Sequence, residues 1–176
     1  MMKRLMAVAA VFVAVFAVAG PVLAQDSFGA RLRGFEEVPS ISSTGQGFFF
    51  AQLDAFETTL TYSLVYASLE SAVSQAHIHI AQRGVNGGIV LFLCTNLTPP
   101  AGVPLPPTCP AGTGPAPNFV GVNGVLTAAN VITQTGQGIS AGEFAEVIHA
   151  IKAGVAYANV HTAGFPGGEI RGQITH

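Results

Sequence analysis

Charged side chains are scarce in this chain of 176 residues, which has 7 Lys and Arg and 9 Asp and Glu. Two of the basic residues, Lys3 and Arg4, lie in an N-terminal leader, which leaves five basic and nine acidic side chains and a formal charge of −4. Nucleic acids and anionic membrane surfaces require clustered Lys and Arg. We therefore expect neither as a partner.

The motifs of several enzyme classes are also missing. The sequence has no G-x-S-x-G elbow, no Walker loop, no dinucleotide fingerprint and no nucleophile beside a base. The glycines at 84, 87 and 88 indicate a turn, because phosphate binding there would need a following helix. These absences leave open whether the protein is an enzyme.

The first 24 residues have the pattern of a signal peptide: a basic start, an apolar run over 5–19, and small residues before Gln25. The run is shorter than the roughly 20 residues that span a membrane, and no cysteine follows it to accept a lipid. We predict a secreted or periplasmic protein without a membrane anchor after cleavage. Residues 25–176 have the usual size of one domain.

Only two cysteines are present, Cys94 and Cys109, and both lie in a Pro-rich stretch. An exported chain meets an oxidising compartment, so the favoured prediction is one disulfide that closes a stiff loop. A thiolate pair that binds metal is the alternative, although the spacing matches no compact zinc knuckle. Asn96 begins a glycosylation sequon that matters only in a host that glycosylates exported proteins.

Short runs rich in Phe, Val, Ile, Thr and Tyr predict a mainly β protein, an antiparallel sandwich or barrel. Alternating apolar residues over 59–66 are typical of a strand with one wet face. Residues 99–118 have no periodic apolar pattern and indicate a loop within the domain. Further strands are predicted at 27–33, 47–53, 155–161 and 169–175.

One helix is predicted over residues 140–153. Ser140 and Glu143 have the spacing of a capping box, and Gly154 is suited to end the helix. Phe144, Val147, Ile148 and Ile151 repeat at helical spacing. His149 lies about 150° from the centre of that apolar stripe, so it should face solvent or a rim.

The stretch QAHIHIAQ contains two of the five histidines. In a strand, His77 and His79 share one face about 6.6 Å apart, so both imidazoles can meet one ion. If the C-terminal hairpin packs beside them, His161 becomes a third ligand in a set that suits copper, or less well zinc. Alternatively, the histidines are polar residues on a wet face or are hydrogen-bonded to backbone.

Four further residues bear on the extent of such a site. Glu169 and Arg171 lie on one face of a predicted strand, where they could pair, bind an anion or orient a ligand imidazole. Structural pairing is the favoured reading of these two. His149 is set aside by its helical position, and the C-terminal His176 is expected to fray.

Three blocks of the sequence together resemble the CHRD domain, the module named after chordin. They are GFEEVPSISSTGQGFFFAQL, AHIHIAQRGVNGGIVLFL and AYANVHTAGFPGGEIRGQI, and the resemblance covers about residues 28–174. It implies an exported β-domain that occurs alone in bacteria and as repeats in chordins. It supplies no established catalytic residue.

The string AHIHI followed by a Gly/Asn turn is also similar to the copper-binding strand of Cu/Zn superoxide dismutases. By that resemblance His77, His79 and His161 would be copper ligands, and Arg171 would steer superoxide. Between Ile80 and Cys94 the sequence has no His, Asp or Glu, so the zinc-binding loop has no equivalent. A copper-only site is the most that this similarity implies.

Two hypotheses of function follow. The first is a binding or structural module of the cell envelope or extracellular space, with a protein or an envelope polymer as its partner and a capacity to bind metal. The second is a copper protein with superoxide dismutase-like activity through His77, His79 and His161. The first predicts small effects of replacing these histidines, and the second predicts a steep loss of metal affinity.

Overall fold

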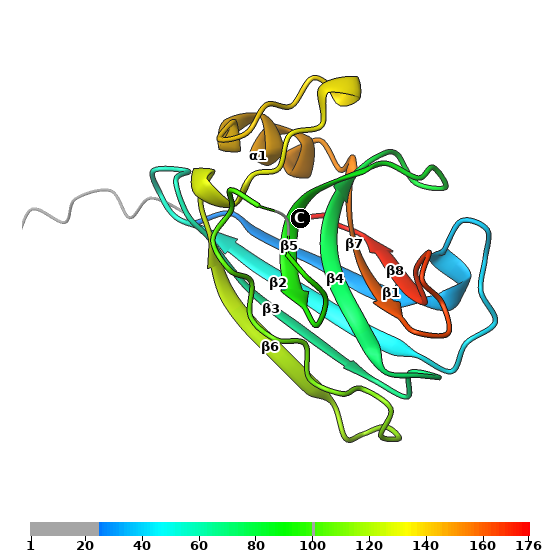
Figure 1. Ribbon diagram of the computed structural model, residues 1–176. Helices are drawn as coiled ribbons and strands as arrows, with labels where there is room; N and C mark the ends of the chain where they lie inside the picture. Colours follow the sequence, from blue (N-terminus) through cyan, green and yellow to red (C-terminus); the bar gives the residue numbers. More distant parts are fainter. Residues whose placement is uncertain (1–24, 100) are drawn as a thin grey trace, which may run out of the picture.

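The computed structural model describes residues 25–99 and 101–176, so the predicted signal peptide lies outside the described residues. Eight antiparallel strands and one α-helix form this part of the chain (Figure 1). The mainly β, antiparallel fold with a single helix is the one that the sequence predicted. The strands are β1 (Ser27–Arg33), β2 (Gln46–Leu53), β3 (Leu60–Ala67), β4 (Val73–Ile80), β5 (Gly88–Thr95), β6 (Val120–Leu126), β7 (Ala156–Thr162) and β8 (Ile170–Gln173). The helix is α1 (Phe144–Lys152), and three 3-10 turns are η1 (Gly34–Glu36), η2 (Ala128–Asn130) and η3 (Thr135–Gln137).

The strands form one sheet in the order β5-β4-β7-β8-β1-β2-β3-β6. The sheet curls into a barrel-like shape that is nearly closed, and the hydroxyl of Tyr62 in β3 donates to the carbonyl of Leu93 in β5. The weakest join within the sheet lies between β8 and β1. These two strands pair at Arg33 and Arg171, and a separate bridge links Gly29 to Thr175.

Strand β3 follows the predicted alternation, with Leu60, Tyr62, Leu64 and Tyr66 buried in the core and Thr61 exposed. Strand β4 differs because both of its faces are buried. Its core face carries Ala76 and Ile78, and its other face carries His77 and His79 beneath loops. The sheet therefore has a second, polar buried layer in this region.

Helix α1 begins at Phe144, four residues later than predicted. The carboxylate of Glu143 does accept from the Ser140 N–H, as in a capping box, at 2.6 Å. Gly142, with φ of 86°, turns the chain between the two residues, so this bond closes a turn that precedes the helix. The predicted apolar face is buried, and Gly154 follows the helix with φ of 69°.

Cys94 and Cys109 form the predicted disulfide, so the alternative of a thiolate metal site is wrong. The Cα atoms of the two cysteines are 5.0 Å apart. The Asn96 side chain reinforces the base of this loop, since it donates to the carbonyls of Val73 and Cys109 and accepts from the Cys109 N–H. The described residues of 99–118 contain no strand or helix, as predicted for a loop.

Replacing both cysteines by alanine is expected to lower the free energy of unfolding by about 3 kcal/mol, because a loop of this length loses that much closure entropy on cross-linking. Urea denaturation of the double variant and of the reduced wild-type protein measures the loss, and the two should agree. A loss below about 1 kcal/mol would show that the loop is already ordered without the bond.

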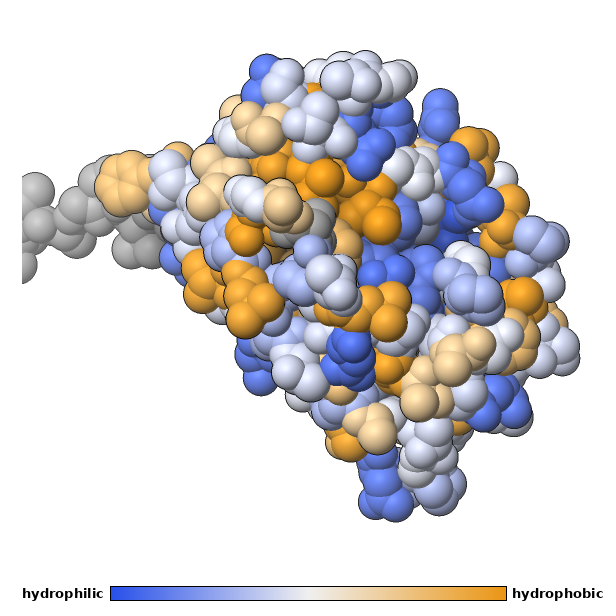
Figure 2. Space-filling view, viewed as in Figure 1, coloured by the Kyte–Doolittle hydropathy of each residue, from blue (hydrophilic) through white to orange (hydrophobic). Residues whose placement is uncertain are grey.

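The surface that faces the viewer in Figure 2 mixes hydrophobic patches with hydrophilic side chains.

Helix α1 lies at one end of the sheet, where Phe144, Val147, Ile148 and Ile151 add to the core (Figure 1). Among the residues that the structure describes, no helix is long and apolar enough to cross a membrane.

Candidate metal centre

The structure brings His77, His79 and His161 together on the outer face of β4 and β7. In the antiparallel register His77 lies opposite Asn159, and His161 lies opposite Gln75, so His161 is diagonal to His77. The ring centroid of His77 is 5.5 Å from that of His79 and 4.9 Å from that of His161. One nitrogen from each ring lies within 4.8 Å of the others. We call these three residues the histidine cluster.

The hydrogen bonds of the cluster leave its ligand atoms free. The Nδ1 atoms of His79 and His161 lie 3.0 Å from the carbonyl oxygens of Gly87 and Pro166. Within the described part of the chain, the Nε2 atoms of both rings, and both nitrogens of His77, are buried without a hydrogen-bond partner. A histidine that donates from one nitrogen to a carbonyl presents the other as a lone pair, which is the arrangement of a metal ligand.

Burial keeps these imidazoles neutral. The pKa of His77 is lowered to about 2, by burial first and then by the neighbouring His161 and His79. Burial lowers the pKa of His79 to about 4 and also lowers that of His161. Metal binding then displaces no proton from the cluster near neutral pH. The alternative of three polar side chains on a wet face is excluded, since His77 is fully buried and the other two are 7 % exposed.

Aromatic rings hold two members of the cluster. The ring of Tyr157 stacks on His79 with centroids 4.7 Å apart and an angle of 3° between the planes. The ring of Phe92, in β5, meets the His77 ring edge-on at 4.3 Å. Both rings exclude water from one side of each imidazole, and they restrict its rotation.

The family model described as CHRD domain matches residues 28–174, and this range includes the three histidines and nearly all of the described strands. The chain belongs to the CHRD domain family. A search of curated proteins and a search of solved structures each found no match. CHRD domains occur in secreted proteins, and the disulfide is suited to an oxidising compartment.

Arg171 of this CHRD domain lies behind the cluster and is 2 % exposed. Its guanidinium carbon is 3.4 Å from the centroid of the Tyr157 ring, which in turn stacks on His79. Its Nη1 donates to the Asn86 side chain at 3.0 Å, and its Nη2 donates to the Val85 carbonyl at 2.7 Å. Because Gly87 follows directly and accepts from His79, Arg171 fixes the loop that orients this imidazole.

Glu169 is fully buried, and its carboxylate serves a different part of the CHRD domain. Its Oε1 accepts from the Ser43 hydroxyl at 2.7 Å and the Glu70 N–H at 2.8 Å, and its Oε2 accepts from the Thr162 hydroxyl at 2.7 Å. These bonds connect the segment before β2, the segment before β4 and the end of β7. Arg171 donates elsewhere, so the structural pairing of the two residues does not occur in the described part of the chain.

Glu37 is a buried acid near the cluster that sequence reasoning missed. Its Oε1 accepts from the Asn159 amide at 2.7 Å, and Asn159 lies opposite His77 in the sheet. Burial raises the pKa of Glu37 to about 7, against the opposing effects of the Arg171 charge and of the bond from Asn159. The two partners are 122 residues apart in the chain, and no motif links them.

Replacing Glu37 by glutamine is expected to change how stability depends on pH. The pKa of Glu37 in the folded state is above its ordinary value of 4.5, so its contribution to stability is present below pH 4.5 and is lost as the pH rises through 7. Relative to Glu37→Gln, the wild-type protein should lose up to about 3 kcal/mol across this window, at about 1.4 kcal/mol per pKa unit. The histidines act on both proteins alike and cancel in the difference.

Denaturation of both proteins at pH 4.5, 5.5, 6.5 and 7.5 measures this difference, with the window set by the raised pKa of Glu37. Parallel stability curves would mean that Glu37 titrates normally.

The two remaining histidines lie outside the cluster. His149 is on the exposed side of α1, as predicted, with 69 % of its side chain accessible to solvent. His176 is exposed, and its ring centroid is 4.6 Å from that of Phe28. His149 therefore provides a matched control for substitutions in the cluster.

Proposed function

We propose that this CHRD-domain protein is an exported binding module that holds one transition-metal ion on His77, His79 and His161. The observation that carries this proposal is the set of buried imidazole nitrogens without partners, one from each ring, within 4.8 Å of each other. Leaving such nitrogens unpaired costs free energy, and a metal ion would recover it. Family membership supports an extracellular binding module in general terms.

The donor set favours copper. The cluster offers three neutral imidazoles and includes no carboxylate or thiolate. Calcium and magnesium prefer oxygen ligands, whereas copper and zinc accept imidazole, and copper binds more tightly at a given nitrogen site. Three protein ligands also leave a coordination position for a small molecule.

Elemental analysis of the purified mature domain, after loading with copper, zinc or magnesium and desalting, tests the proposal. We expect close to one copper per chain, less zinc, and no magnesium. Copper at the level of a His77→Ala, His79→Ala and His161→Ala triple variant would contradict it. The His149→Ala variant should retain the wild-type content.

Superoxide dismutation is a second candidate, because a cation lies near the three imidazoles: the Arg171 guanidinium carbon is 3.4 Å from the centroid of the Tyr157 ring, which stacks on His79. A bound copper ion would supply the one-electron chemistry. Arg171 itself is 2 % exposed and donates to Val85 and Asn86, which favours a positioning role for it over the steering of superoxide. Copper-dependent disappearance of superoxide that is lost in His77→Ala would support the activity, and equal rates in both proteins would contradict it.

A further inference from the structure

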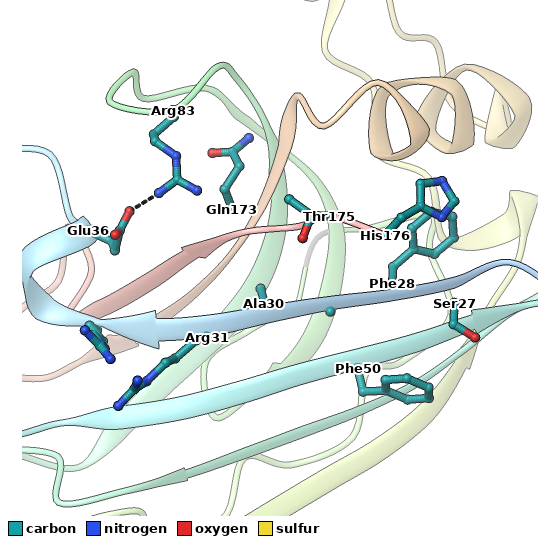
Figure 3. Close-up of a pocket in the computed structure, with 12 residues that line it drawn as sticks. Ser27, Phe28, Ala30, Arg31, Glu36, Phe50, Arg83, Gln173, Thr175 and His176 are labelled. Atoms are coloured by element: carbon teal, nitrogen blue, oxygen red, sulfur yellow. Dashed lines mark hydrogen bonds and ion pairs between the residues drawn. The ribbon is translucent and has the colours of Figure 1, made fainter.

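A cleft of about 520 Å³ lies where the two halves of the sheet join, between β8 and β1 (Figure 3). Along this join, β1 and β8 pair at Arg33 and Arg171 and again at the Gly29–Thr175 bridge. Figure 3 shows Arg83 and Glu36 on the side of β1 where Gln173 lies, and Phe50 of β2 on the other side. No member of the histidine cluster lines it.

This cleft collects positive charge in an otherwise acidic protein. The described residues contain five basic side chains, and three of them, Arg31, Arg33 and Arg83, line this one cleft. The acidic side chain in the lining is Glu36, which is bonded to Arg83. Arg31 and Arg33 are exposed and form no ion pair within the described chain. Two uncompensated guanidinium groups therefore remain to meet an anion.

An apolar platform adjoins these arginines. Phe50 is 53 % exposed, and the residue directly opposite it in β1 is Gly29, which has no side chain to cover the ring. Phe48, which is 44 % exposed, lies opposite Arg31 and contacts the ring of Phe119 at 5.9 Å between centroids. Exposed rings thus run from the cleft across the sheet, beside the arginines.

We propose that the cleft binds an acidic polysaccharide, with a uronate carboxylate at Arg31 and Arg33 and the face of a sugar ring on Phe50. Guanidinium groups bind carboxylates through paired, charge-assisted hydrogen bonds, and aromatic faces pack against the apolar face of a ring. The row of rings beyond Phe50 suits a polymer that repeats both features. This binding does not depend on the proposed metal site.

Isothermal titration of the mature protein with a galacturonate hexasaccharide tests the proposal. We expect Arg31→Gln and Arg33→Gln each to weaken binding about tenfold or more, and Phe50→Ala to weaken it similarly. Lys152→Gln removes a charge that is paired with Asp26 and Glu57 outside the lining. Phe56→Ala removes a ring that is 82 % exposed and also outside it. These two controls should bind as the wild-type protein does.

Gly29→Val provides an independent variant that fills the cleft. A Cβ atom at this position would approach no described atom closer than the Phe49 carbonyl oxygen at 3.7 Å, which is an ordinary contact. Valine also suits a strand. We expect the variant to keep the wild-type melting temperature and to lose binding, because its methyl groups would stand in the lining of the cleft, directly opposite Phe50.

Three results would overturn the proposal. If cellohexaose, which is neutral, binds as tightly as the galacturonate hexasaccharide, the arginines do not recognise a carboxylate. Equal binding of inorganic sulfate would reduce the site to a general anion site, and equal binding of hexaglutamate with the same dependence on Arg31 and Phe50 would assign it to an acidic peptide. Copper-loaded and metal-free protein should bind the hexasaccharide equally. If the protein does not bind the hexasaccharide, the proposal of a metal site is therefore unaffected.

Discussion

Replacing His77 by alanine is expected to lower the affinity for copper by at least about 100-fold, since removing even a group that orients a ligand costs 10- to 100-fold. His77 differs from the other two members of the cluster, because neither of its nitrogens has another partner in the described chain. Competition with a chelator of known affinity measures the change. His149→Ala, which replaces an exposed histidine, should leave the affinity unchanged.

The same residue gives a second, opposite effect on the metal-free protein. Burying unpaired polar nitrogens is unfavourable, so His77→Leu should stabilise the metal-free protein by about 1–2 kcal/mol. Copper at about 1,000 times the wild-type dissociation constant should add about 4 kcal/mol to the wild-type protein, and no more than about 1.4 kcal/mol to a variant that binds it 100-fold more weakly. A variant that is less stable than the metal-free wild type, and that gains as much stability from copper as the wild-type protein does, would rule out His77 as a ligand.

The face shared by His77 and His79 could be predicted because side chains alternate in a strand, whatever lies around them. Adding His161 required only that the C-terminal hairpin pack beside β4, which it does. The burial of the cluster was not predictable in the same way. It depends on the loops of Gly87 and Pro166, whose carbonyls orient two imidazoles and which carry no pattern that marks this role.

The errors have a common physical cause. The capping box at Ser140 is a local pattern, and one of its two bonds does form, from the Ser140 N–H to the Glu143 carboxylate. Gly142 nevertheless diverts the chain before the helix begins. Glu37 gave no signal because its partner, Asn159, is distant in the chain. Patterns within a segment predicted the strands, whereas contacts between distant segments decide which polar groups are buried.

Glu169→Ala is expected to lower the free energy of unfolding by about 3–5 kcal/mol, the cost of breaking a buried polar network by removing one partner. The carboxylate accepts from Ser43, Glu70 and Thr162, which lie before β2, before β4 and at the end of β7. Alanine would leave all three donors buried or half-buried without this acceptor. For a domain of this size the loss corresponds to a fall in melting temperature of about 10 °C.

The Glu169→Gln variant distinguishes the contribution of the hydrogen bonds at this position from that of the negative charge. Glutamine keeps one carbonyl oxygen for Ser43 and the Glu70 N–H, and its amide can donate to the Thr162 hydroxyl, which can accept as well as donate. We expect it to recover more than half of the stability lost in Glu169→Ala, as measured by thermal denaturation. Copper affinity should stay near the wild-type value in both folded variants, because Glu169 bonds to no member of the histidine cluster. A large loss of copper affinity in the well-folded glutamine variant would instead connect this carboxylate to the metal centre through Thr162 and β7.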